Sequence, residues 1–296
     1  MNTQDLVAPV ADDILRMADQ TEQDRCLPEP LMDRLTQAGL FSIYTPHKFG
    51  GLELPLPEAL RVVEEVSRLD GSTGWTVSLG FANDLLTCGM PDEGAAQVLR
   101  NGSALIAGAP GFGVRAEAVD GGYCLTGQWP FCSGAHNATW MNVLAPIFDG
   151  DTPRMGAAGP EMILAFMPPS DVEIVDTWHV TGLRGTGSHD LRVHQVFVPA
   201  LLTGSAALPT GPRPVRESKL ARIPFMTAIG IAQSPAICLG IARHAVGKQQ
   251  RGQHRQPVLR RDQRLEAEAG QRVDQPSRGA AVSRLARRHP LRLDAP

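Results

Sequence analysis

The sequence predicts an α+β protein with a helical N-terminal region, a middle region of strands and one further helix. Apolar residues recur at helical spacing through the first hundred residues. From about Asn101 onward, short apolar stretches alternate and are separated by Gly, Pro and Asp turns. A long apolar segment after residue 221 restores a helical pattern. Several strands without intervening helices are typical of a small barrel or sandwich.

Five helical stretches are predicted in the N-terminal region. The first is indicated by apolar residues at helical spacing: Leu6, Val7, Val10, Ile14, Leu15 and Met17. Pro28 and Pro30 introduce the second, because proline is favoured in the first turn of a helix. Pro57 opens the third, whose apolar side carries Leu60, Val62, Val63, Val66 and Leu69. The last two are expected over 73–88 and 91–99.

The middle region is predicted to form strands. Residues 114–119 and 123–126 alternate around the turn Asp120-Gly-Gly122, which is typical of a β-hairpin. Further strands are expected over 104–107, 141–147, 162–167, 172–175 and 191–198. A link rich in Pro, Gly and Ser follows over 199–214, and one long apolar helix is expected over 222–246.

These patterns predict four segments: a helical N-terminal domain (1–102), a β-barrel middle domain (103–215), one C-terminal helix (216–247) and a disordered tail (248–296). The tail contains no Phe, Tyr, Trp, Ile or Met and has many more basic than acidic residues. Such a composition does not offset the entropy cost of ordering a chain. Two other interpretations stay open. The tail is a basic segment for nucleic acid or acidic lipid, or it is an out-of-frame translation of a GC-rich gene.

The bulk composition is that of an ordinary globular protein. The net charge of −3 gives no general attraction to nucleic acid or to a membrane surface. The five cysteines are scattered, without a CxxC pair, so we expect reduced thiols rather than disulfides or a metal site. The N-terminus lacks the apolar segment of a signal peptide, and no apolar run is long enough to span a bilayer. We therefore expect a cytoplasmic protein without a nucleic-acid, membrane or metal partner.

Two irregular stretches carry residue types that suit a planar, polar ligand. In Gly127–Trp140, a turn after a predicted strand combines backbone N–H groups and the Ser133 hydroxyl with the aromatic rings of Trp129 and Phe131. Such a turn also occurs in protein cores at the rim of a barrel. Trp178–Asp190 is rich in Gly and hydroxyl residues around one arginine, which suits anionic oxygens or a polar ring edge. Neither stretch contains a Walker loop or a GxGxxG motif.

The order of these motifs resembles the acyl-CoA dehydrogenase superfamily. The middle-domain signature of that family, GxKxWI(T/S)NA, is matched in register by Gly127, Phe131, Cys132, Ser133 and Ala135. Its later GxRG(S/T) motif, its VxVP strand ending and its N-terminal vPeeyGG loop are matched by Gly182–Thr186, Val196–Pro199 and Thr45–Gly51. The joint order of these landmarks over residues 28–246 is more specific than any one of them.

Three segments look like the two-component flavin monooxygenases of that superfamily: Asp70–Trp75, Trp129–Gly134 and Gly185–Asp190. In that branch a separate flavin reductase supplies reduced FMN or FAD, which hydroxylates a small aromatic or related substrate with O2. The resemblance implies the same activity, cofactor and partner here, in a homotetramer. It also implies a four-helix C-terminal bundle, of which only the first helix is recognisable.

The resemblance implies site residues as well. The expected cofactor contacts are Phe131, Cys132, Ser133, Arg184, Thr186 and Ser188. Among them, Ser133 would hydrogen-bond near the N5/O4 edge of the flavin, and Phe131 and Cys132 would line its ring. The expected substrate contacts are Trp75 and Asn83. Some hydroxylases carry a substrate-facing histidine in this region, whereas Asn83 and Asp84 are the polar residues here, and no catalytic base can be assigned.

Three functional hypotheses stay open. The first is the monooxygenase. The second is an acyl-CoA dehydrogenase that desaturates an acyl-CoA with FAD, although Phe131-Cys-Ser133 departs from the W-x-T signature of those enzymes. The third is an inactive fragment without its bundle. His136, His179 and His189 are candidate acid–base groups, but a lone histidine is more often a hydrogen-bonded structural residue.

Overall fold

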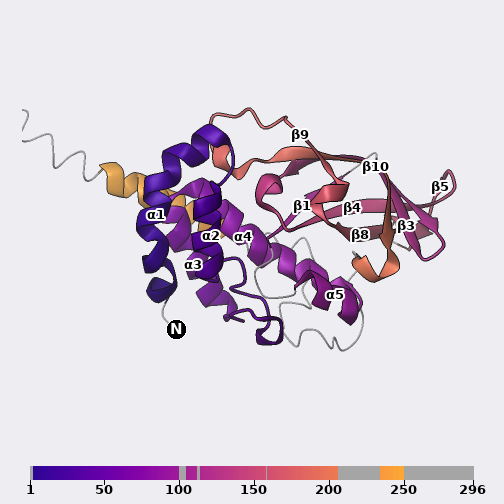
Figure 1. The fold of residues 1–296 in the computed structure, drawn as a ribbon, viewed down its shortest axis with the longest axis horizontal. Helices are drawn as coiled ribbons and strands as arrows, with labels where there is room; N and C mark the ends of the chain where they lie inside the picture. Colours follow the sequence, from indigo (N-terminus) through magenta and orange to yellow (C-terminus); the bar gives the residue numbers. More distant parts are fainter. Residues whose placement is uncertain (1–2, 100–104, 112–113, 158, 206–233, 250–296) are drawn as a thin grey trace, which may run out of the picture. The chain divides into compact units, whose positions relative to one another are not determined.

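The structure is a computed structural model of the chain, and it describes residues 3–99, 105–111, 114–157, 159–205 and 234–249 (Figure 1). The chain divides into two compact units, Met1–Val246 and Gly247–Pro296. Of the second unit only residues 247–249 are described, so the predicted tail lies almost wholly outside the described residues.

The helical stretches predicted in the first hundred residues are confirmed. They are α1 (Thr3–Asp24), α2 (Glu29–Gln37), α3 (Leu56–Leu69), α4 (Gly71–Leu86) and α5 (Asp92–Val98). Two short 3-10 helices lie among them, η1 (His47–Phe49) and η2 (Thr87–Gly89). Pro28 and Pro55 stand directly before α2 and α3 in extended conformations, so each helix begins where a proline fixes the entry angle of the chain.

One apolar cluster holds the helices together. Its fully buried members include Val10, Ile14, Leu31, Leu35, Val62, Val63 and Val66. Leu15, one of the apolar residues that indicated this helix, lies outside the cluster, and its side chain is 51% exposed. It follows the buried Ile14 by one residue, which is a rotation of about 100° around the helix axis.

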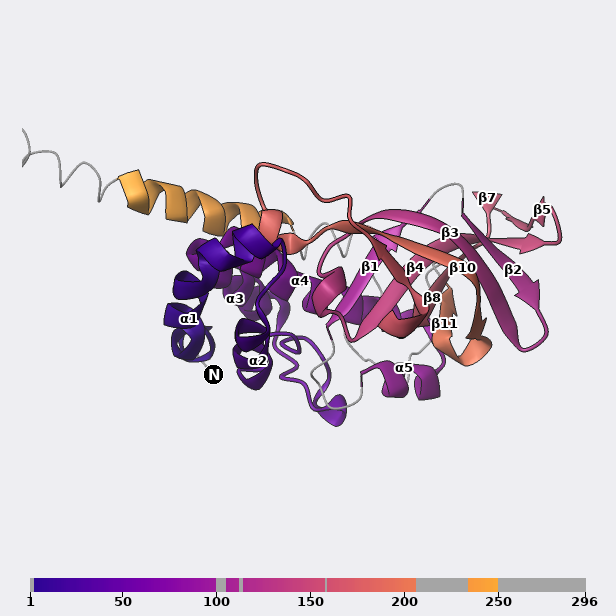
Figure 2. The same ribbon diagram turned by 45° about the horizontal axis from the view of Figure 1, so that its top comes forward.

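The middle region forms one nine-stranded mixed sheet (Figure 2). Its strands are β1 (Ile106–Pro110), β2 (Arg115–Val119), β3 (Gly122–Cys132), β4 (Trp140–Asp149), β5 (Thr152–Pro153), β8 (Met162–Met167), β9 (Glu173–Val175), β10 (His189–Pro199) and β11 (Thr203–Ser205). The order is β11-β8-β4-β2-β3-β10-β9, with β1 and β5 also paired to β4. β1 and β2 run parallel to β4, and the other pairs are antiparallel. A helical region followed by such a sheet agrees with the predicted α+β class.

The predicted strands are all confirmed, but four short ones were missed. β5, β6 (Met155–Gly156) and β7 (Gly159–Pro160) have two residues each and contain Gly or Pro in a turn-rich stretch. β11 lies inside the segment predicted as a link. Such strands are too short for an alternating pattern, and only their pairing defines them: β5 pairs with β4, β11 with β8, and β6 with β7 in a separate two-stranded sheet.

The sheet has its own apolar cluster, with Trp129, Phe166 and Met141 among its buried members. The indole Nε1 of Trp129 donates a hydrogen bond to the backbone oxygen of Leu144 at 2.9 Å. Of the two interpretations of this turn, a stacking partner for a bound ring and a core turn, the structure supports the core turn for Trp129, because its side chain is 0% exposed inside this cluster.

The last described helix spans residues 234–249. It confirms the predicted helix over 234–246, whereas residues 222–233 lie outside the described part. Its Ile237 side chain is buried in the helical cluster, and the Arg243 guanidinium pairs with the Glu64 carboxylate of α3. Leu239 and Ile241 stay exposed. Each helix within the described ranges is too short or too polar to cross a membrane.

Candidate flavin site

Pairing between β3 and β10 brings the two motif stretches together. In this antiparallel pair Cys132 stands opposite His189, so the residues after β3 meet the residues before β10. The backbone N–H of Gly134 donates to the backbone oxygen of Thr186 at 2.7 Å. The two motif stretches are far apart in sequence, yet their predicted cofactor residues Ser133 and Ser188, 55 residues apart, lie at the same end of this strand pair.

Phe131 is held in a strained backbone conformation at this place. Its φ is +62°, a left-handed value that costs energy for a bulky side chain. The ring is 68% exposed and packs edge-on against the Trp178 ring, with centroids 6.3 Å apart. Strained backbone conformations cluster at active and ligand-binding sites, so the φ of Phe131 makes this residue a candidate ligand contact.

Three hydroxyl groups form a buried chain that begins at Ser133, two residues after Phe131. Ser133 Oγ and Ser188 Oγ lie 2.6 Å apart, and Ser188 Oγ lies 2.7 Å from Thr186 Oγ1. Thr186 Oγ1 donates to the backbone oxygen of Leu183 at 2.9 Å. Ser133, Thr186 and Ser188 are each at most 6% exposed. Three of the predicted cofactor residues thus form one hydrogen-bonded unit.

The side chains of Cys132 and Arg184 are held by the protein itself, Cys132 by burial and Arg184 by a hydrogen bond. The Cys132 side chain is fully buried, and burial raises the pKa of its thiol above the usual range, so this thiol stays protonated and unreactive. Cys132 can therefore face a ligand only through its backbone. Arg184 Nε donates to the backbone oxygen of Glu22 at 3.0 Å, which ties the guanidinium to the end of α1.

The loop around Arg184 is packed against the helical region. It contains the 3-10 helix η6 (Arg184–Thr186). A Cβ placed on Gly185 would lie 2.2 Å from Thr21 Cγ2, so only glycine fits this contact. The Glu22 carboxylate accepts from Ser72 Oγ at 2.9 Å, and the Gly185 N–H points to the same oxygen at 3.5 Å. These contacts fix the position of Thr186 and Ser188.

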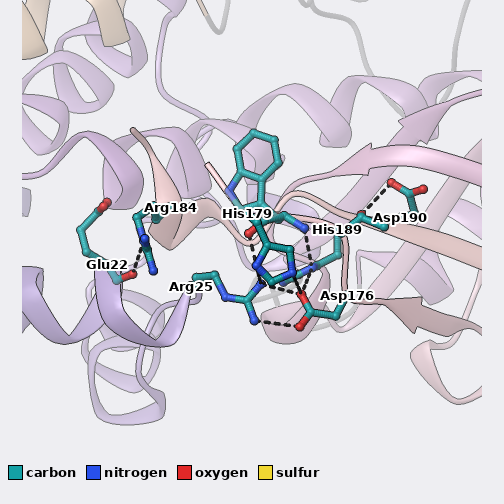
Figure 3. A network of polar contacts seen from close by, with 9 residues as sticks. Glu22, Arg25, Asp176, His179, Arg184, His189 and Asp190 are labelled. Atoms are coloured by element: carbon teal, nitrogen blue, oxygen red, sulfur yellow. Dashed lines mark hydrogen bonds and ion pairs between the residues drawn. The ribbon is translucent and has the colours of Figure 1, made fainter. Parts of the chain in front are cut away.

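Figure 3 shows polar contacts around two residues next to the hydroxyl chain in sequence, Arg184 and His189. The Arg25 guanidinium forms a two-pronged pair with the Asp176 carboxylate, with 2.9 Å between Nη2 and Oδ2, and this pair lowers the pKa of Asp176 to about 2. Asp176 Oδ1 also lies 3.3 Å from Nδ1 of the buried His189. Burial and the neighbouring His136 lower the pKa of His189, so its imidazole is neutral near pH 7.

These contacts show where two of the three histidines considered as acid–base groups, His179 and His189, lie. His189 is buried beside Asp176, and its ring packs edge-on against that of His136 at 5.0 Å between centroids. His179 is exposed and lies near the Arg25 guanidinium. The backbone N–H of Trp178 donates to His189 Nδ1 at 3.3 Å, so His189 is a hydrogen-bonded structural residue in this conformation. Its position, and the pair Arg25–Asp176 that supports it, could not be found from sequence spacing.

The α4 helix closes another side of the site. A Cβ placed on Gly134 would lie 3.4 Å from Leu79 Cδ1 and 3.7 Å from Thr76 Cγ2. Trp75 is partly buried against the helical cluster, and its Nε1 is buried without an acceptor among the described residues. Asn83 falls in 81–85, whose side chains lie outside the described part.

Two other features bear on the site. Among the described residues, no group of three or more His, Cys, Asp or Glu side chains is placed to hold a metal ion. A cavity of about 790 Å³ is lined by parts of η2, β8 and β11 and includes none of the predicted site residues. The candidate site near Phe131 is instead at the surface, where an exposed ring is followed two residues later by the first hydroxyl of a buried chain.

Comparison with known proteins agrees with this arrangement. Residues 3–95 match the family described as acyl-CoA dehydrogenase, N-terminal domain. The oxygenase component of an FADH2-dependent resorcinol hydroxylase from a Rhizobium strain is 34% identical over 83% of this chain and 62% of its own length. The oxygenase subunit HsaA of a flavin-dependent monooxygenase from Mycobacterium tuberculosis is 35% identical over 62% of this chain and 45% of its own length.

Solved structures give the same result. The 3-HSA hydroxylase from a Rhodococcus species has a TM-score of 0.76 at 26% identity, over 86% of this chain and 66% of that one. XiaF from a Streptomyces species, solved with FADH2 and glycerol, has a TM-score of 0.70 at 25% identity, over 80% and 60%. The chain spans 55–62% of the length of the first three curated relatives. Residues 3–95 thus match the N-terminal domain family of the acyl-CoA dehydrogenases, and most of the chain resembles the oxygenase components of flavin-dependent monooxygenases.

Proposed function

We propose that the chain is the oxygenase component of a two-component monooxygenase. A partner flavin reductase supplies reduced flavin, and a small aromatic substrate is hydroxylated with O2. The single observation that carries the proposal is the joint placement of the exposed Phe131 ring and the Ser133–Ser188 hydroxyl pair. The names of the relatives support the substrate class, since they include resorcinol and indole-3-acetate hydroxylating enzymes.

The residues present fit a flavin. Its isoalloxazine is a planar ring with one polar edge, which needs an apolar face and a nearby hydrogen-bonding group. Phe131 offers an exposed apolar face, and Ser133 offers an oxygen two residues further on. Bound reduced flavin supplies the electrons for activating O2, while the chain orients the ring. FMN and FAD are both compatible with these contacts.

The remaining predicted residues receive supporting roles in this proposal. Thr186 and Ser188 act through Ser133 because their hydroxyls are buried. Arg184 holds the loop to Glu22 and directs its remaining guanidinium donors toward flavin oxygens. Trp75 and Asn83 of α4 contact the substrate, and the unpaired indole N–H of Trp75 is a donor for a substrate oxygen.

The proposal also includes the domain boundaries expected from the sequence. In the proposal, residues 1–102 form the helical domain, 103–215 the flavin-facing β-barrel and 216–247 the first helix of a bundle, which continues to residue 249 in the structure. Four copies assemble through the bundle, as in the family, and the exposed Leu239 and Ile241 provide apolar contacts for it.

The test supplies the purified chain with a flavin reductase, NADH, FAD or FMN, and a panel of small phenols. The expected product is a substrate heavier by one oxygen atom, with a lower yield per NADH in Ser133→Ala. Oxygen consumption without any hydroxylated product would contradict the proposal. Bleaching of bound FAD by an acyl-CoA would instead support the dehydrogenase hypothesis.

A further inference from the structure

We propose that Thr186 and Ser188 are positioning residues that fix the direction of the Ser133 hydroxyl, so that its oxygen can only accept a hydrogen bond from the cofactor. This direction makes the site favour flavin in the reduced state. The inference rests on the proposed function, because it takes Ser133 to face the N5 edge of the ring.

The backbone carbonyl of Leu183 determines the direction of hydrogen bonding along the hydroxyl chain. The oxygen of Leu183 has no hydrogen to give, and it lies 2.9 Å from Thr186 Oγ1. If Thr186 pointed its hydrogen elsewhere, two oxygen lone pairs would face each other at that distance. Thr186 therefore donates to Leu183, and its own oxygen is left as an acceptor.

The other two hydroxyl groups follow by elimination. Each hydroxyl has one hydrogen. Since the hydrogen of Thr186 points to Leu183, the 2.7 Å contact requires Ser188 to donate to Thr186. The 2.6 Å contact then requires Ser133 to donate to Ser188. All three side chains are buried, so exchange of these partners with bulk water is opposed by the packing. Ser133 Oγ keeps only lone pairs for a ligand.

A Ser133 hydroxyl that can only accept a hydrogen bond distinguishes the two redox states of a flavin. The N5 atom of a reduced isoalloxazine carries a hydrogen and donates, whereas N5 of the oxidised ring has none and accepts. Reduced flavin therefore finds an acceptor at Ser133. For oxidised flavin, Ser133 must either withdraw its hydrogen from Ser188 or reverse the whole chain against the Leu183 carbonyl. Both cost about one hydrogen bond.

The test measures the dissociation constants of oxidised and reduced FAD and FMN for the chain under anaerobic conditions, and compares their ratio among variants. Thr186→Val and Ser188→Ala release the direction of Ser133. The ratio of oxidised to reduced dissociation constants is expected to fall about fivefold or more in both. A tenfold fall corresponds to about 30 mV in the midpoint potential of bound flavin.

Two variants serve as controls. Thr186→Ser keeps the hydroxyl and is expected to keep the ratio. Thr203→Val removes a similar hydrogen bond, because Thr203 Oγ1 donates to the backbone oxygen of Ala200, three residues earlier, at 2.8 Å. Thr203 directly follows the 3-10 helix η7 (Ala200–Leu202), as Thr186 ends the 3-10 helix η6. A general loss of stability would change both dissociation constants together and leave their ratio unchanged.

The outcomes are distinguishable. A ratio that falls in Thr186→Val and Ser188→Ala but stays at the unmodified value in Thr186→Ser and Thr203→Val supports the inference. Saturable binding of both states with the same ratio in all variants overturns the inference alone. Absence of saturable binding of either state to the folded chain overturns the proposed function and the inference with it.

Discussion

The hydroxyl oxygens of Ser133 and Ser188 lie 2.6 Å apart although 55 residues separate them in the chain. The contact exists because β3 and β10 pair in a register that places Cys132 opposite His189. Both serines are buried, so each relies on protein groups for hydrogen bonds: Ser133 on Ser188, and Ser188 on Ser133 and Thr186. The geometry of the candidate site therefore depends on the pairing of β3 with β10. Substitutions that shift the loop before β10 should change the distance between Ser133 and Ser188.

The first prediction concerns two glycines of this loop. Gly185→Ala would bring a Cβ to 2.2 Å from Thr21 Cγ2, whereas a Cβ on Gly182 meets no atom within 4 Å. We expect Gly185→Ala to lower the free energy of unfolding by about 1–3 kcal/mol, and Gly182→Ala to change it by less than about 0.5 kcal/mol. Urea unfolding of the two variants checks this difference. Equal stability of the two would show that the loop is not packed against α1 as described.

The second prediction concerns the strain at Phe131. Phe131→Gly and Phe131→Ala both remove the ring, but only glycine adopts φ +62° without a steric cost. We expect the glycine variant to be more stable than the alanine variant by about 1 kcal/mol, and both to lose flavin affinity. Phe197 is a matched control, because it is an exposed aromatic on β10 without a positive φ. There the alanine variant should be the more stable one, and the same order at both positions would contradict the strain.

The third prediction concerns pH and the buried His189. Its pKa lies below the usual value because of burial and because of His136, while Asp176 acts in the opposite sense. The unfolded chain binds a proton near pH 6.5 that the folded chain does not. The free energy of unfolding should therefore fall as the pH drops below about 6.5, and level off below the folded pKa.

His189→Asn should remove that part of the pH dependence. The measurement is urea unfolding of the two proteins between neutral and mildly acidic pH. His194→Asn, at an exposed position of β10, is the control and should keep the slope. If the slope were the same in all three proteins, His189 would not be buried in its neutral form.

The fourth prediction concerns the pair Arg25–Asp176. The pKa of Asp176 is lowered to about 2, first by the hydrogen bonds from Arg25. Its contribution to stability should be present above about pH 4 and be lost as the pH falls toward 2. Asp176→Asn should therefore be less stable than the unmodified chain at pH 7 and approach it in acid. Asp151→Asn, at a fully exposed carboxylate, should match the unmodified chain throughout.

Local patterns were sufficient to predict most of the fold. Helical spacing and proline positions predicted α1 to α5, because each helix buries one continuous apolar side. The spacing alone does not show which apolar residues are buried, since the apolar Leu15 lies beside the buried stripe of α1 and is exposed. β11 was missed because its three residues, Thr203–Ser205, lack an alternating pattern and pair with β8.

The site was less accessible to prediction from sequence. Motif order pointed to Ser133, Thr186 and Ser188, but not to the direction of hydrogen bonding between them, which depends on distances to Leu183. Trp129 has the residue type of a stacking partner, and only the side of β3 on which it lies shows it to be core. Arg25 and Asp176 lie about 150 residues apart, and no local pattern links them.

The most direct test of the central claim is an anaerobic titration of the purified chain with reduced FAD and FMN, followed by absorbance or fluorescence. The account predicts saturable binding, which is about fivefold weaker in Ser133→Ala because one hydrogen bond is lost. Circular dichroism of both proteins shows whether the fold is intact. Unchanged binding in Ser133→Ala, or no saturable binding by a folded chain, would contradict the claim that this surface holds a flavin.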